Sequence, residues 1–147
     1  MRPSRLRFAS APIPFRTSFG HASARREQAE NVLVLAEDAQ GLYGIGEGCP
    51  RPYVTGETSE SAAAFLKRHR SELGELDGIP ALRQWMELRA AEIDANPSAF
   101  CAAELALLDL FSRQHGAGVE TLLGLDPPMR PLTVTVLPCI VPLKSAT

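Results

Sequence analysis

The chain has 147 residues, which is too few for a (β/α)8 barrel of roughly 250 residues and enough for one compact domain. Its hydrophobic fraction of 45%, charged fraction of 22% and formal net charge of -2 are typical of a soluble globular protein and argue against a nucleic-acid binder, which would carry clustered Lys and Arg. No run approaches the roughly 18 apolar residues of a membrane span and no signal peptide is visible, so we expect a cytoplasmic protein without a membrane partner.

The first third of the chain predicts an antiparallel meander. Residues 4–15 alternate apolar and basic side chains and contain two prolines, a pattern typical of an edge strand. Residues 31–37 are rich in Val and Leu, residues 38–41 have turn chemistry, and residues 42–47 predict a returning strand. Together they indicate a β-hairpin joined to the first strand.

After the hairpin the hydrophobic period changes from two to about three and a half. Residues 62–73 predict a first helix, whose N-terminus Thr58 or Ser59 could cap. Residues 79–95 predict a second helix, with Pro80 in its first turn. The centre of the chain is therefore helical.

A third helix has the clearest boundaries. Asn96 is a favoured N-cap and Pro97 suits the first helical position, while Gly116 is a typical stop after the last turn. Residues 119–123 predict one further helical turn, and residues 132–137 alternate as a strand with no visible partner. The order of three strands, three helices and one isolated strand predicts an α+β fold.

Few residues could carry chemistry. His21, His69 and His115 lack a second ligand at a metal-binding spacing, so we interpret each as structural or solvent-facing. Glu104 and Asp109 are five positions apart on the third helix and point to different sides, so they cannot act as one carboxylate pair. We expect each to accept hydrogen bonds from a cation or from backbone amides.

Closely spaced glycines occupy the returning strand. The dinucleotide-binding pattern G-x-G-x-x-G needs its third glycine at a different position from that of Gly48. The alternation of Gly44, Gly46 and Gly48 instead predicts a close backbone approach or a bulge, with Glu47 near the end of the strand.

Three segments resemble the N-terminal capping domain of enolase-superfamily enzymes of the muconate-lactonizing and dipeptide-epimerase kind. They are residues 13–20, the glycine-rich strand at 41–48 that contains Glu47, and the A-x-E-x-A-x-x-D-L helix at 102–110 with the closing L-L-G at 122–124. The resemblance implies a three-stranded antiparallel meander followed by a three-helix bundle, with the barrel absent. It assigns residues 1–125 to the capping domain.

In such enzymes the capping domain closes the open end of a barrel, and two of its loops complete the substrate pocket. The resemblance places these loops at residues 17–25 and 49–57. A small carboxylate substrate would be bound only if a barrel were present, and a homo-oligomer is possible. The residues expected to face the substrate are Thr17, Phe19, Arg51, Tyr53 and Thr55.

The family reaction is abstraction of a proton next to a carboxylate, with Mg²⁺ and a Lys or His base. The resemblance places this machinery in the barrel, so we expect no catalytic residue, metal ligand or cofactor in this chain and no activity from it alone. Mg²⁺ is expected only in a full-length relative. The alternative is a freestanding α+β binding or interaction module; a complete small enzyme would need a catalytic constellation that the sequence does not show.

The end of the chain departs from the family pattern. Residues 126–147 comprise a linker, a remnant of the first barrel strand and a divergent tail at 138–147 that resembles no relative. We hypothesise a frameshift, an early stop or a gene-model error. Resequencing the gene beyond the stop would contradict this if no frame encoded a barrel. Neither the substrate nor the oligomeric state follows from the sequence.

Overall fold

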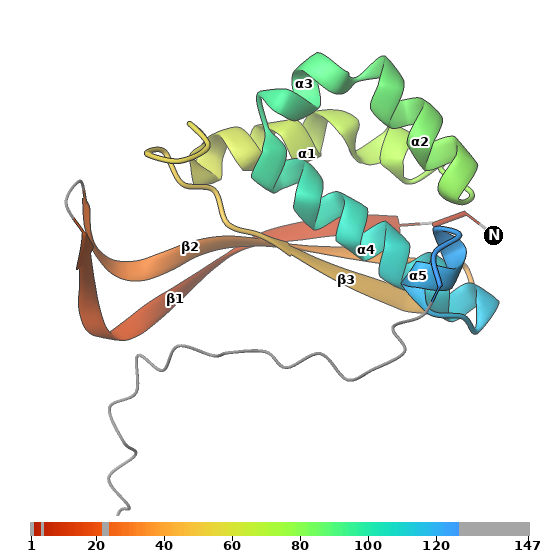
Figure 1. Ribbon diagram of the computed structural model, residues 1–147, viewed down its shortest axis with the longest axis horizontal. Coiled ribbons are helices and arrows are strands. Elements are labelled where there is room, and N and C mark those ends of the chain that lie inside the picture. Colours follow the sequence, from red (N-terminus) through yellow and green to blue (C-terminus); the bar gives the residue numbers. More distant parts are fainter. Residues whose placement is uncertain (1, 4, 22–23, 127–147) are drawn as a thin grey trace, which may run out of the picture.

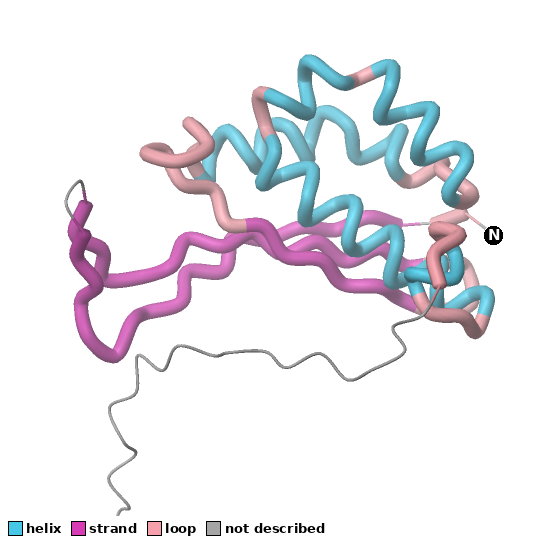
Figure 2. The backbone as a smooth tube through the Cα atoms, in the orientation of Figure 1, coloured by secondary structure: helices cyan, strands magenta, loops and turns pink. Residues whose placement is uncertain are grey.

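The computed structural model describes residues 2–3, 5–21 and 24–126, with the backbone alone described at 17–21 and 24–26. A three-stranded antiparallel sheet is covered on one face by helices (Figures 1 and 2). The strand order β1-β2-β3 is the predicted meander. The strand and the tail expected at 132–147 lie outside the described residues. The strands are β1 (Arg5–His21), β2 (Ala24–Glu37) and β3 (Tyr43–Gly48).

The β1–β2 hairpin is longer than the sequence suggested. The loop expected at 17–25 was wrong, because the backbone of β1 continues to its end at His21 and β2 begins at Ala24. Pro14 pairs with Gln28 and Phe19 pairs with Arg26, so β1 advances by five positions where β2 advances by two. This bulge interrupts the period-two alternation that reveals a strand in a sequence, and it bends the hairpin.

The helices follow the predicted order with one break. Thr58 caps the first helix through a capping box with Ser61. The second predicted helix is divided at Arg89, which leaves the helical conformation with φ -116° and ψ 14°. A break of one residue preserves the hydrophobic spacing, so the sequence pattern did not reveal it. The helices are α1 (Ser59–Leu73), α2 (Ile79–Leu88), α3 (Ala90–Asp94), α4 (Pro97–His115) and α5 (Val119–Leu122).

Helix α4 packs directly on β3, where every second residue of the strand is glycine. A Cβ atom built on Gly46 would lie 2.6 Å from Ala106 N and closer still to Ala102 O. Gly44 and Gly48 face the same helix at equally short range. The close backbone approach predicted from these glycines is therefore confirmed.

The apolar core lies between the sheet and the helices. Alternate residues of β2 point toward α4 and α1 and are buried, as period-two alternation requires. The α+β fold class predicted from the sequence is confirmed, and none of the helices in the described part of the chain is long and apolar enough to span a membrane. Large contributors to the core are Val32, Val34, Phe65, Leu66, Leu73, Leu107, Leu110 and Phe111.

The opposite face of the sheet carries exposed apolar side chains. Leu33, Tyr43 and Ile45 are 39%, 48% and 51% exposed and lie on neighbouring strands. No helix in the described part of the chain covers this face (Figure 1). Such a patch is typical of a surface that meets another protein or domain.

Candidate functional site

Residues 49–57 leave the end of β3 and form a compact turn. The carbonyl oxygen of Arg51 accepts hydrogen bonds from Val54 N at 2.9 Å and from Thr55 N at 2.8 Å. The Thr55 hydroxyl donates to the same carbonyl and accepts from Arg51 N, each at 3.3 Å. The turn therefore holds its own shape through backbone and hydroxyl contacts.

Both ends of this segment are fastened to the first turn of α4. At the first end, Ser98 Oγ donates a hydrogen bond to the carbonyl oxygen of Cys49 at 3.2 Å. At the other end, the carboxylate of Glu57 accepts from Ser98 N at 2.8 Å and from Ala99 N at 3.0 Å. Glu57 is only 1% exposed. These contacts satisfy amides that the helix itself cannot pair, and they fix the segment relative to α4.

The cap expected from Asn96 was wrong. The Asn96 side chain makes no capping hydrogen bond and donates instead to the carbonyl oxygen of Glu92 at 3.0 Å. The capping acceptor is Glu57, which lies 41 positions before Ser98. Sequence reasoning missed Glu57 because capping signatures are sought within a few residues of a helix start.

The turn brings three of the predicted substrate-facing residues together. Arg51 and Tyr53 are exposed at its surface, and neighbouring Val54 is 66% exposed, although the sequence gave no reason to select it. The Thr55 hydroxyl is engaged inside the turn. Arg51 Nε donates to Cys49 Sγ at 3.4 Å, and this contact raises the pKa of Arg51, so the guanidinium stays cationic.

Thr17 and Phe19 lie on β1 near the end of the long hairpin, and their side chains fall outside the described part. Val32 pairs with both Ser10 and Gly48, so the hairpin extension and the 49–57 segment leave the sheet at the same end. Figure 1 shows both at that end of the molecule. A substrate role for these residues stays a prediction.

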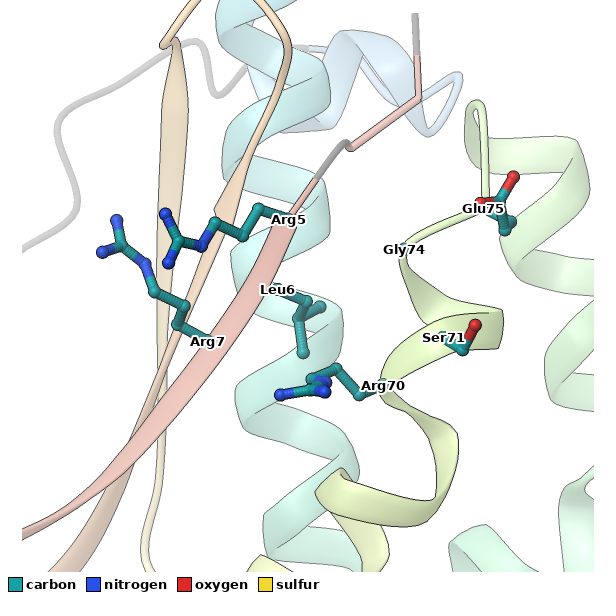
Figure 3. Close-up of a pocket in the computed structure, with 7 residues that line it drawn as sticks. All are labelled: Arg5, Leu6, Arg7, Arg70, Ser71, Gly74 and Glu75. Atoms are coloured by element: carbon teal, nitrogen blue, oxygen red, sulfur yellow. The ribbon is translucent and has the colours of Figure 1, made fainter.

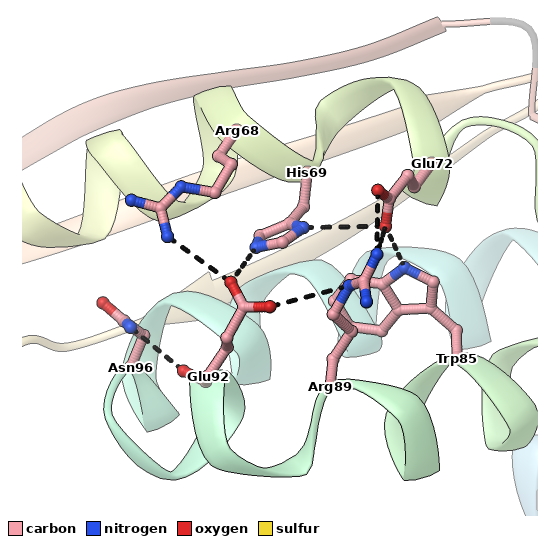
Figure 4. A network of polar contacts seen from close by, with 7 residues as sticks. All are labelled: Arg68, His69, Glu72, Trp85, Arg89, Glu92 and Asn96. Atoms are coloured by element: carbon pink, nitrogen blue, oxygen red, sulfur yellow. Dashed lines mark hydrogen bonds and ion pairs between the residues drawn. The ribbon is translucent and has the colours of Figure 1, made fainter.

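The other polar cluster joins α1, α2 and α3 around a histidine (Figure 4). His69 is 3% exposed, and its Nε2 lies 3.0 Å from Glu92 Oε2. Glu72 accepts from Trp85 Nε1 at 2.8 Å and from Arg89 Nη2 at 3.1 Å. These contacts tie three helices together, which agrees with a structural role for His69. The described residues contain no group of three His, Cys, Asp or Glu side chains placed to hold a metal.

The carboxylate of Glu72 makes this cluster sensitive to acid. The hydrogen bond from Trp85, followed by that from Arg89, holds the pKa of Glu72 below its ordinary value of 4.5. Ionised Glu72 therefore stabilises the folded state above pH 4.5, and this contribution is lost as the pH falls through the lowered pKa. We expect Glu72→Gln to lower the Tm at pH 7, with a difference from wild type that shrinks toward pH 3. The control is Glu87→Gln on the exposed side of α2; an equal effect of both changes would contradict the prediction.

The sequence pattern of one family covers nearly all of the described chain. Residues 5–124 match the family described as mandelate racemase / muconate lactonizing enzyme, N-terminal domain. The chain belongs to the mandelate racemase / muconate lactonizing enzyme family. The enolase-superfamily resemblance of the sequence is thereby confirmed, together with the assignment to the N-terminal domain of that family.

Relatives within the family include dipeptide epimerases. An aromatic dipeptide epimerase from Herpetosiphon aurantiacus is 34% identical over 116 residues, which are 76% of this chain and 31% of the relative. An L-Lys-D/L-Arg epimerase from Methylococcus capsulatus is 34% identical over 125 residues, which are 84% of this chain and 33% of the relative. The chain thus spans about a third of the length of these relatives.

A solved structure shows the same arrangement. The dipeptide epimerase from Methylococcus capsulatus, crystallised with Mg and the dipeptide L-Arg-D-Lys, is similar with a TM-score of 0.72 and 28% sequence identity. The match covers 84% of this chain and 35% of that structure. The described residues therefore have the N-terminal domain fold of a mandelate racemase / muconate lactonizing enzyme.

The two acidic residues of the family-like segment in α4 have different surroundings. Asp109 accepts from Ile45 N at 3.0 Å and from Arg113 Nε at 2.9 Å, which confirms the expected structural role and ties α4 to β3. The partner expected for Glu104 is not found among the described residues. Burial without such a partner raises the pKa of Glu104.

Glu104 therefore acts against the stability of the described domain at neutral pH. Because its folded-state pKa is raised above the ordinary 4.5, the ionised carboxylate destabilises the fold at pH 7, and this penalty disappears as the pH falls below 4.5. We expect Glu104→Gln to raise the Tm at pH 7 and to leave it unchanged at pH 4. Thermal unfolding followed by circular dichroism at both pH values tests this. A lower Tm at pH 7 would show that the carboxylate has a stabilising partner.

Proposed function

We propose that this chain is the substrate-capping N-terminal domain of an enolase-superfamily isomerase, racemase or cycloisomerase of the dipeptide-epimerase kind, and that it is inactive alone. The observation that carries the proposal is the double attachment of residues 49–57 to α4. Cys49 and Glu57 fix the two ends, and the turn between them exposes Arg51, Tyr53 and Val54. A rigid turn with exposed side chains at one end of a sheet is suited to shape one wall of a pocket.

The chemistry of the turn suits a dipeptide. The cationic guanidinium of Arg51 offers paired donors to a carboxylate, while Tyr53 and Val54 offer apolar surface to a side chain. These residues would contribute binding and orientation of the substrate. The described residues do not fit a metal site, so we assign no metal-dependent step to them. Proton abstraction would belong to the part of the family enzyme that extends beyond this domain.

A chimeric enzyme tests the proposal. Residues 1–126 would be fused to the remainder of the L-Lys-D/L-Arg epimerase from Methylococcus capsulatus, and epimerisation of a dipeptide panel would be measured with Mg²⁺. We expect activity from the chimera and none from the chain alone. In the chimera, Arg51→Ala and Tyr53→Ala should raise KM several-fold, whereas Arg83→Ala on α2 should not.

The control for the chimera is the Methylococcus capsulatus enzyme rejoined to its own N-terminal domain through the same junction. If that control is active while a folded chimera epimerises no dipeptide in the panel, the capping proposal is wrong. If the chimera is active but Arg51→Ala and Tyr53→Ala leave KM unchanged, the domain is a cap whose 49–57 turn does not contact the substrate.

The second candidate is a freestanding binding or interaction module, and the exposed apolar face of the sheet supports it. The two candidates differ in what this face does in the isolated chain. A cap without its barrel should self-associate through the face, and Ile45→Glu should reduce that association in sedimentation velocity. A monomeric, stably folded chain together with an inactive chimera would favour the module.

A further inference from the structure

A polar pocket lies between the edge strand β1 and the C-terminal part of α1. Its volume is 410 Å³, and three of its lining residues are arginines, with Arg5 and Arg7 from β1 and Arg70 from α1 (Figure 3). The same pocket is lined by Ser71 and Glu75. The pocket thus gathers three guanidinium groups from two elements that are distant in the sequence.

The pocket lies away from the 49–57 segment. Arg5 pairs with Glu37, which pairs in turn with Tyr43 at the start of β3. The 49–57 segment follows the other end of β3. The pocket and the proposed substrate-facing turn therefore occupy opposite ends of the sheet, and the pocket is separate from the proposed function.

The charges at the pocket do not balance. Arg7 Nη2 forms an ion pair with Glu37 at 2.9 Å, and Glu75 is paired with Arg2. Arg5 and Arg70 have no hydrogen-bond or ion-pair partner among the described residues. Two positive charges are therefore left over at this pocket, although the chain as a whole has a formal net charge of -2.

Most arginines elsewhere in the described structure have a polar partner. Arg89 and Arg113, for example, bind Glu72 and Asp109. Arg16 and Arg83 are the other two arginines with described side chains and no such partner among the described residues, and neither lines this pocket. Two of the four unpaired arginines thus meet at one place.

Each arginine also has an ordinary structural explanation. Arg70 lies in the last turn of α1, where a cation favours the helix dipole, and charges on an edge strand discourage strand addition. These explanations account for single charges. They give no reason for Arg5, Arg7 and Arg70 to line the same pocket.

We propose that this pocket binds a phosphate-type oxyanion with two negative charges. Arg5 and Arg7 are two positions apart on one strand and leave the same face roughly 7 Å apart, so both long side chains can reach one phosphate group. Arg70 supplies a third guanidinium from α1, and the Ser71 hydroxyl supplies a neutral donor. Guanidinium groups bind phosphate oxygens in pairs, which makes this donor set suited to a dianion.

Titration of the 147-residue chain with inorganic phosphate tests the proposal. Binding would be followed by amide chemical shifts at pH 7.5, with sodium chloride added to hold the ionic strength constant. We expect saturable shifts at residues 5–7 and 70–75. Arg5→Gln combined with Arg70→Gln should weaken binding at least tenfold, and Arg83→Gln, which removes an unpaired arginine outside the pocket, should leave it unchanged.

Folding and ligand size are separated by further arms of the experiment. The circular dichroism spectrum of each variant reports folding, and the charge-preserving variant Arg70→Lys should retain part of the affinity. Phenyl phosphate distinguishes the source of the anion: equal or tighter binding indicates the phosphoryl group of a larger molecule, and rejection indicates free phosphate. Shifts that stay linear with phosphate concentration, or equal weakening by Arg83→Gln, would overturn the proposal.

Discussion

Gly46→Ala is expected to destabilise the protein by about 3 kcal/mol or more, because the new methyl group would overlap the backbone of α4. The added Cβ would lie 2.6 Å from Ala106 N and closer to Ala102 O. Neither backbone atom can move without shifting the whole helix away from β3. Urea unfolding followed by the fluorescence of Trp85 measures the effect as a lower midpoint.

The matched control for this change is the next residue of the same strand. Ile45 points to the opposite face of the sheet and is 51% exposed, so Ile45→Ala should cost less than about 1 kcal/mol. A result in which Gly46→Ala is as mild as Ile45→Ala would mean that α4 can lift from the sheet. The close contact between helix and strand would then contribute little to the fold.

Glu57→Ala is expected to cost about 3 kcal/mol, since it leaves two buried amides at the start of α4 without an acceptor. Ser98 N and Ala99 N both donate to the Glu57 carboxylate, which is 1% exposed. The change also releases one end of the 49–57 segment. Hydrogen exchange at the amides of Val54 and Thr55 should therefore accelerate, in addition to the loss of stability measured in urea.

The control is Glu60→Ala, which removes an exposed carboxylate from the first turn of α1. That change should cost less than about 1 kcal/mol and leave exchange in the 49–57 segment unaltered. If Glu57→Ala proves equally mild, water replaces the carboxylate at α4. In that case the turn is held by its own hydrogen bonds and by Cys49.

Interactions within a few residues were predictable from the sequence. The Thr58 cap and the Gly116 stop each depend on atoms in one turn of helix, and both occur as expected. The alternation of Gly44 and Gly46 predicted a close approach of backbone, although it did not indicate which element approaches. Local hydrophobic period and turn chemistry were thus enough to give the α+β class and the order of its elements.

Only the tertiary structure decided how the candidate site is held. Glu57 meets Ser98 because α4 lies beside the end of β3, and no pattern near either residue encodes a contact across 41 positions. The bulge after Pro14 and the helix break at Arg89 likewise depend on packing partners elsewhere in the fold. A sequence determines by itself the contacts that close within a turn. Contacts between elements form only where packing brings those elements together, and these contacts fix the 49–57 turn and gather the arginines on β1 and α1.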